Sequence, residues 1–83
     1  MVHSRIKALE ELHAVARAGR KAASDSLTYH AYLDAESSIW NLIAHLEIAQ
    51  GELLNSKSSE VVLMVNELLV VSDDAIRIYK EAL

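Results

Sequence analysis

The chain has 83 residues, of which 52% are hydrophobic and 24% charged, and its formal net charge is −4 at pH 7. This balance is typical of a single globular domain and is too apolar for a disordered segment. The sequence contains no cysteine, which excludes disulfide scaffolds, thiolate zinc sites and cysteine nucleophiles. With no proline and only two glycines, it has little turn chemistry for β-hairpins, so we expect an all-α fold.

The first helix is expected over residues 5–23, with Ser4 as its N-cap. Its apolar residues recur at spacings of three and four and are Ile6, Leu9, Leu12, Val15 or Ala16, and Ala22 or Ala23. After Leu12 this face is mainly alanine, with Gly19 in its middle. Small residues let another helix approach closely but bury little area, so we expect this helix to be the least stable.

The second helix is expected over residues 26–54, after the capping cluster of Ser24, Asp25 and Ser26. It carries a heptad seam of Tyr32, Ala35, Ile39, Leu42, Leu46, Ala49 and Leu53, which Trp40 and Ile43 widen on one side. Gly51 is a candidate C-terminal stop, but good helix formers follow it. We therefore expect the helix to end near Leu54.

The third helix is expected over residues 59–82, after a polar connection of residues 55–59. It has two adjacent apolar seams. One is Val61, Met64, Leu68, Val71, Ala75, Ile78 and Ala82, and the other is Val62, Val65, Leu69, Ser72, Ile76, Tyr79 and Leu83. A helix that covers one core needs a single stripe a little over 100° wide, so two seams predict neighbours on both sides. Leu63 and Val70 add apolar residues to the remaining polar strip.

A β-structure is the alternative for residues 61–65 and 68–71, which are rich in β-branched side chains. However, both faces of either strand would be apolar, and Asn66 and Glu67 are the sole turn residues between them. Acidic residues also repeat every seven positions, at Glu60, Glu67, Asp74 and Glu81, which favours a helix.

Charge is distributed unevenly, with a net +3 over residues 1–24 and −7 over residues 25–83. We expect the basic first helix to lie against acidic neighbours in the bundle or in a dimer mate; the alternative is an acidic external partner. Arg17, Arg20 and Lys21 form the candidate patch for an anionic partner, with Arg5 and Lys7 two to three turns earlier. The acidic net charge, and the lack of aromatic residues in this helix, argue against direct nucleic-acid binding.

No catalytic or metal motif is complete. Glu10 and His13 have the Glu-x-x-His spacing of carboxylate-bridged di-iron bundles, but His30 and His45 lack a glutamate three residues earlier. A phosphotransfer histidine would be followed by lysine and glycine, whereas His13 is followed at those positions by Ala16 and Arg17. The serines cluster near the connections, where capping explains them. We therefore expect no enzyme activity, metal or cofactor.

A chain this short buries a small core and gains most from self-association, since it has no disulfides. The sequence thus predicts a three-helix antiparallel bundle completed by homodimerisation through the third helix. The expected oligomer or partner interface consists of Val61, Leu63, Met64, Leu68, Val70, Val71, Ile78, Tyr79 and Trp40.

By elimination, these patterns favour a small non-enzymatic interaction protein, acting as a regulator, adaptor or antagonist by helix-mediated binding to another protein. The alternatives are a nucleic-acid-associated regulator that uses the basic first helix, and a structural subunit of a larger assembly. No apolar run reaches the ~20 residues that span a membrane, and the N-terminus does not resemble a signal peptide, so a cytoplasmic location is expected.

Overall fold

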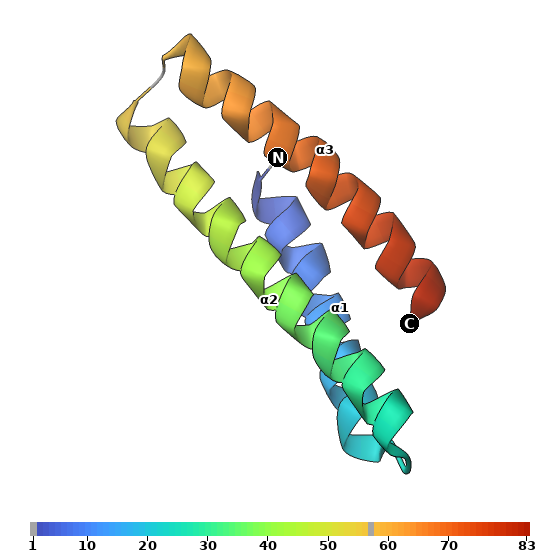
Figure 1. The fold of residues 1–83 in the computed structure, drawn as a ribbon. Helices are drawn as coiled ribbons and strands as arrows, with labels where there is room; N and C mark the ends of the chain where they lie inside the picture. Colours follow the sequence, from blue (N-terminus) through green and yellow to red (C-terminus); the bar gives the residue numbers. More distant parts are fainter. Residues whose placement is uncertain (1, 57) are drawn as a thin grey trace.

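The computed structural model describes residues 2–56 and 58–83, which form three α-helices (Figure 1). They are α1 (Val2–Ala22), α2 (Ser26–Asn55) and α3 (Ser59–Ala82). Successive helices run in opposite directions and pack along their sides. This arrangement confirms the predicted all-α three-helix bundle, and because residues 61–71 lie within α3, the β alternative is wrong.

Capping side chains begin the second and third helices. Asp25 is the N-cap of α2: its Oδ1 accepts a hydrogen bond from the Thr28 backbone N–H, and its Oδ2 accepts one from the Thr28 hydroxyl, both at 2.8 Å. These bonds hold the pKa of Asp25 below its ordinary value, the backbone N–H contributing most. Ser58 Oγ caps α3 by accepting from the Val61 N–H at 3.3 Å. Lys57 of the second connection lies outside the described residues.

The start of the first helix differs from that expected, whereas the end of the second lies within one residue of the predicted end. α1 begins at Val2 rather than at Arg5, because Val2 is itself buried in the core and extends the apolar face by one turn, so Ser4 lies inside the helix. α2 continues through Gly51 to Asn55. Gly51 does not adopt a positive φ, so it does not form the left-handed cap that would end a helix there.

The core runs along the seam where the helices meet. Leu9 of α1, Ile39 and Leu46 of α2, and Val65 of α3 are fully buried. The remaining buried apolar residues are Val2, Ile6, Leu12, Ala16, Ile43, Ala49 and Leu69. These residues follow the three-and-four spacing of the predicted faces, so hydrophobic burial is what positions the helices.

The α1–α2 pair has the most extensive contact of the helix pairs. Small residues of α1 make this possible: a Cβ added to Gly19 would lie 2.6 Å from Cδ1 and Cζ of the Tyr32 ring on α2, and nearer still to Cε1. A side chain at this position therefore conflicts with the observed packing of Tyr32. Gly19 therefore allows α1 and α2 to approach closely and does not form a turn.

α3 packs on the α1–α2 pair through its second seam, in which Val65, Leu69 and Ser72 are buried. The buried Ser72 hydroxyl donates a 2.7 Å hydrogen bond to the Leu68 carbonyl of the preceding turn, so its burial leaves no unpaired polar atom. A two-pronged ion pair joins α3 to α1. Arg5 Nε and Nη2 donate to the two carboxylate oxygens of Asp73 at 2.8 and 2.9 Å.

The bundle is long and thin. Its principal extents are 49 × 19 × 18 Å, and its radius of gyration is 14.4 Å, against about 12 Å for a compact domain of this length. The accessible surface is 5564 Å², roughly 600 Å² more than the ~4,900 Å² that scaling with mass gives for a folded monomer of 9.2 kDa. The chain therefore leaves a larger share of its surface exposed than a compact domain of this size does.

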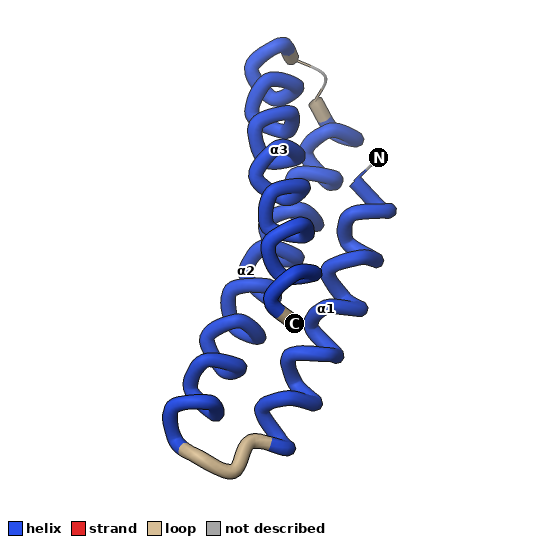
Figure 2. The backbone as a smooth tube through the Cα atoms, turned by 90° about the vertical axis from the view of Figure 1, so that its right-hand side faces the viewer, coloured by secondary structure: helices blue, strands red, loops and turns tan. Residues whose placement is uncertain are grey.

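The far end of the α1–α2 hairpin extends beyond the C-terminal end of α3 (Figure 2). A shallow depression of about 440 Å³ lies where α3 ends, lined by Leu27, Thr28, Ala31, Tyr32, Ala35, Tyr79, Ala82 and Leu83. Among the described residues, none of the helices is both long and apolar enough to cross a membrane.

Candidate functional site

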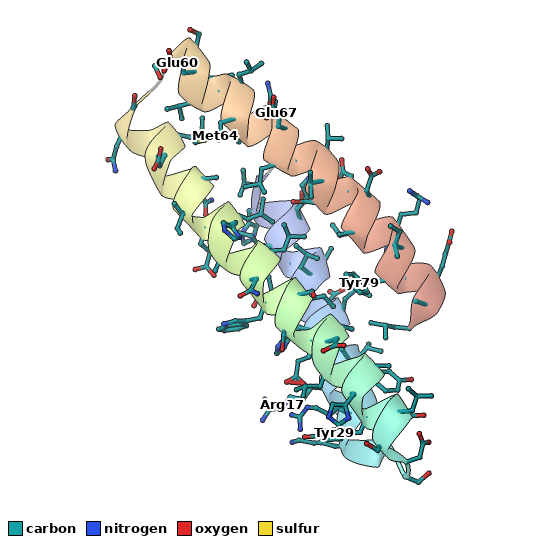
Figure 3. The ribbon with its side chains drawn as sticks, in the orientation of Figure 1. Arg17, Tyr29, Glu60, Met64, Glu67 and Tyr79 are labelled. Atoms are coloured by element: carbon teal, nitrogen blue, oxygen red, sulfur yellow. The ribbon has the colours of Figure 1, made fainter. Side chains whose placement is uncertain are left out.

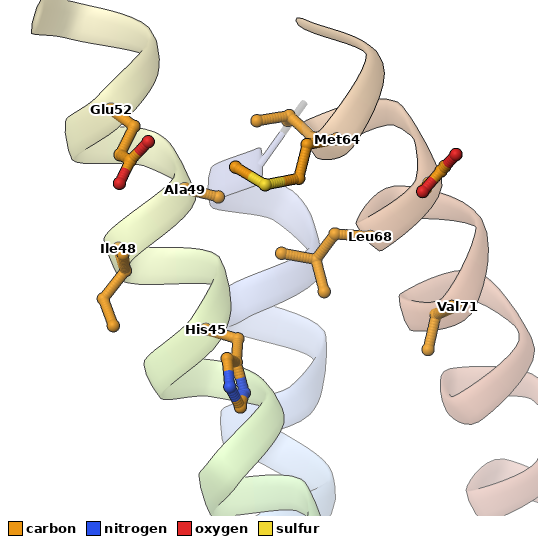
Figure 4. A pocket seen from close by; sticks show the side chains of 9 residues that line it. His45, Ile48, Ala49, Glu52, Met64, Leu68 and Val71 are labelled. Atoms are coloured by element: carbon orange, nitrogen blue, oxygen red, sulfur yellow. The ribbon is translucent and has the colours of Figure 1, made fainter. Parts of the chain in front are cut away.

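A mainly apolar groove lies between α2 and α3 (Figure 4). Its volume is about 430 Å³. His45, Ile48, Ala49 and Glu52 line it from α2, and Met64, Val65, Glu67, Leu68 and Val71 line it from α3. We call this feature the α2–α3 groove. Ala49 and Val65 are buried and form its floor.

Large apolar side chains form the walls of the α2–α3 groove. Met64 projects from α3 toward α2 (Figures 3 and 4). The exposed fractions are 53% for Met64, 56% for Val71 and 62% for Ile48. Full burial of such a side chain contributes about 1.5–3 kcal/mol, so covering the exposed halves of these three would contribute roughly 2–4 kcal/mol before the costs of association. The groove thus exposes apolar surface whose burial would be favourable.

The polar groups of the α2–α3 groove are two carboxylates and an imidazole. Glu52 comes from α2 and Glu67 from α3. His45 Nδ1 lies 2.8 Å from the carbonyl oxygen of Asn41, one turn earlier on α2. A carbonyl oxygen can only accept, so Nδ1 carries the hydrogen of this bond. No lysine or arginine is among the described residues that line the groove.

The interface residues predicted on α3 divide into two sets. The exposed set has more than half of each side chain open, from 52% at Ile78 to 64% at Leu63, and comprises Leu63, Met64, Val70, Val71 and Ile78. Val61, Leu68 and Tyr79 are half-buried and pack against the core, and Tyr79 lies between α3 and the other helices (Figure 3). One flank of α3 is therefore exposed, whereas the other packs against the core of the bundle.

Trp40 lies on a different face from the exposed residues of α3. Its ring is 5.4 Å from that of His13 on α1, measured between centroids, and it borders two shallow depressions lined by α1 and α2. The predicted interface set is thus not one continuous patch. The indole remains 60% exposed beside His13.

The basic residues singled out on α1 also differ in their environments. Arg17 and Lys21 are exposed. Arg20 is half-buried, and its Nε donates to Glu36 Oε2 on α2 at 2.8 Å, with Nη2 3.4 Å from Oε1. Its guanidinium carbon also lies 5.9 Å from the centroid of the Tyr29 ring. Arg20 therefore acts mainly within the bundle, as expected for a basic helix beside acidic neighbours.

The Arg20–Glu36 ion pair changes the proton affinity of both groups. The hydrogen bond from Arg20 holds the pKa of Glu36 below its ordinary value, opposed in part by burial. The same bond raises the pKa of Arg20. Both groups are thus charged at neutral pH, and the pair joins the alanine-rich end of α1 to α2.

Six of the groove residues were not among the predicted site residues: His45, Ile48, Ala49, Glu52, Val65 and Glu67. Ala49 and Val65 were predicted on the apolar seams of their helices. Ile48 carried a usable signal, because it is a large apolar residue outside the heptad seam of α2. His45, Glu52 and Glu67 are polar residues on two helices, and no local sequence pattern connects them.

Within residues 2–56 and 58–83, no group of three or more histidine, aspartate or glutamate side chains is placed to hold a metal ion. No family model matches the chain, and no curated protein or solved structure shows significant similarity to it. Its site must be interpreted from its own residues.

Proposed function

We propose that this protein is a non-enzymatic interaction module, a regulator, adaptor or antagonist, that binds a helix in the α2–α3 groove. The observation that carries the proposal is the groove itself: an apolar floor, with walls of Ile48, Met64 and Val71 that are more than half exposed. Two long antiparallel helices with an apolar groove between them are the geometry into which an amphipathic helix docks.

The surface of the subunit supports this proposal. The excess of roughly 600 Å² over a compact monomer approaches the ~800 Å² that each partner buries in a specific interface of standard size. The uncovered flank of α3 extends past the groove to Ile78. A docked helix would follow this flank and complete a four-helix arrangement.

A second copy of the chain is the other occupant consistent with this proposal. It corresponds to the homodimer through α3 that the sequence predicts, and the exposed Leu63 and Val70 would enlarge its interface. Light scattering over a range of concentrations distinguishes the two forms. A mass of 9.2 kDa and a melting midpoint independent of concentration would reject the homodimer.

The experiment that tests the proposed function compares two matched variants of the tagged protein in its native cells. Met64→Glu places a charge in the α2–α3 groove, and Leu54→Glu places one at the exposed end of α2, outside the groove. We expect the groove variant to lose the proteins that co-purify with wild type, and the control variant to retain them. Equal recovery with both variants would refute docking in the groove.

A further inference from the structure

The uncovered flank of α3 combines apolar and acidic residues in register. Met64, Val71 and Ile78 are spaced by seven residues, and so are Glu60, Glu67, Asp74 and Glu81, which we call the acidic row. A spacing of seven keeps residues on one side of a helix, with a drift of about 20° per repeat. Glu67 belongs to the acidic row and also lines the α2–α3 groove. The α3 wall is thus an apolar stripe bordered by carboxylates.

The α2 wall repeats this combination. Glu52 lies four residues after Ile48, so the two side chains are neighbours on one helical face. Both glutamates that line the α2–α3 groove are exposed. An occupant of the groove therefore meets an apolar floor with a carboxylate on each wall, and no lysine or arginine among the described lining residues.

We infer that the occupant of the α2–α3 groove is a basic amphipathic helix of another protein. This inference rests on the proposed function and adds the chemistry of the partner. Apolar residues of the partner at positions i, i+3, i+4 and i+7 would cover Ile48, Met64 and Val71. Lysine or arginine on either side of that stripe would pair with Glu52 and Glu67.

The length of the groove walls sets the length of the partner helix. The lining residues span 45–52 on α2 and 64–71 on α3. At about 1.5 Å per residue, each wall extends roughly 10–12 Å, or about two helical turns. The contacting part of the partner is thus about two turns, and a helix of three to four turns presents it with its ends clear of the site.

Charge argues against a second copy as the occupant. The exposed apolar residues of α3 are bordered by the acidic row, so pairing α3 with its symmetry mate would bring two acidic rows together. Each subunit also carries a net charge of −4. Of the basic residues on α1, Arg5 and Arg20 are already paired with Asp73 and Glu36. Like charges placed together weaken an interface, whereas a basic helix would be attracted to it.

Two labelled peptides of about 14 residues, or four helical turns, test this inference by fluorescence anisotropy. Both carry leucine on one helical stripe, bordered by lysine in the first peptide and by glutamate in the second. The protein is tested as wild type and as two double variants. Glu52→Gln/Glu67→Gln removes the charges of the groove, and Glu10→Gln/Glu11→Gln removes the same charge from exposed positions of α1.

We expect the lysine peptide to bind wild type, and the glutamate peptide to bind at least about tenfold more weakly. The groove variant should weaken binding of the lysine peptide by about fivefold to tenfold, and the α1 variant by less than about twofold. Each variant should melt as wild type does, since all four positions are exposed. Equal binding of the two peptides, or equal weakening by the two double variants, would overturn the inference.

Two further measurements separate failure of this inference from failure of the proposed function. If both peptides bind equally and Ile48→Ser/Met64→Ser weakens both, the groove docks helices without selecting charge. If neither binds and wild type has twice the mass of its Met64→Glu variant, the occupant is a second copy. Both outcomes overturn the inference alone. If neither peptide binds and the protein is monomeric at every concentration, the proposed function fails as well.

Discussion

Replacing Gly51 and Gly19 by alanine, one at a time, is expected to have unequal effects on the free energy of unfolding. Both glycines lie inside helices and neither has a positive φ. In a helix interior, alanine is more favourable than glycine by about 0.8–1 kcal/mol. At Gly51, apart from neighbouring residues and the backbone of its own helix, no atom lies within 4 Å of the added Cβ. Gly51→Ala should therefore stabilise the protein by about 0.5–1 kcal/mol.

At Gly19 the same change meets the ring of Tyr32. The added Cβ would lie 2.6 Å from Cδ1 and Cζ of that ring, whereas carbon atoms in contact prefer about 3.5–4 Å. Either the ring moves by about 1 Å or the two helices separate, and such overpacking costs about 1–3 kcal/mol. Because the gain in helix propensity is common to both variants, the difference between them measures this steric cost.

Thermal unfolding followed by circular dichroism at one protein concentration measures that difference. For a domain of this size, 1 kcal/mol shifts the melting midpoint by about 4–8 °C. Gly51→Ala should melt above wild type, and Gly19→Ala below Gly51→Ala by at least the lower value. If Gly19→Ala stabilises as much as Gly51→Ala, the ring of Tyr32 does not constrain the approach of α1 to α2, and the reasoning is refuted.

Three other predictions concern pH and packing. Arg20 holds the pKa of Glu36 below 4.5, so the stabilising effect of this ion pair is complete above that pH and is lost as the pH falls through the lower folded-state pKa. The melting midpoint of Glu36→Gln should therefore fall less on acidification than that of wild type. Parallel decreases of the two midpoints would exclude this role. Leu46→Ala, at a fully buried site, should lower the free energy of unfolding in urea by about 2–5 kcal/mol. Ile48→Ala, at an exposed site, should lower it by less than about 1 kcal/mol. Equal losses would contradict the burial of these two residues. Ser72→Ala should change the free energy of unfolding by no more than about 1 kcal/mol, because the lost hydrogen bond goes to the backbone of the same helix. A larger loss would show that the Ser72 hydroxyl has a further role.

Local patterns in the sequence were sufficient to predict the helices. The near absence of turn residues left long helices as the consistent solution, and Asp25 marked the start of the second by a side chain that satisfies an unpaired backbone N–H. Leu9, Ile39 and Leu46 were predicted on apolar faces, and all three are fully buried. Helical periodicity thus predicted which residues form the core between α1 and α2.

Periodicity could not decide which seam of the third helix faces inward. The seam containing Met64 and Val71 is the more apolar, yet the seam containing the polar Ser72 packs against the other helices. Serine is small, and its hydroxyl bonds to the carbonyl one turn earlier, so its burial is inexpensive. Which seam is covered depends on how α3 sits against α1 and α2, which no window within α3 reveals.

The groove depends on the same long-range placement. Ile48 and Met64 are separated by a connection and belong to different helices, so only the tertiary arrangement brings them to one hollow. For Trp40, aromatic character predicted an interface role but not a direction, and the ring lies beside His13 on α1. The sequence shows that α3 has more apolar residues than one core needs, but only the packing of the three helices shows where the exposed ones lie.

The unequal contacts among the helices bear on how binding and folding are linked. α1 and α2 share the largest contact, and α3 rests on them through a narrower one. Amide protons of α3 should therefore exchange with solvent sooner than those of the hairpin beneath it. A helix seated between α2 and α3 would tie them together, so occupancy should slow exchange in α3 more than in α1. Amide exchange rates along the whole of α3 would then distinguish the bound protein from the free protein.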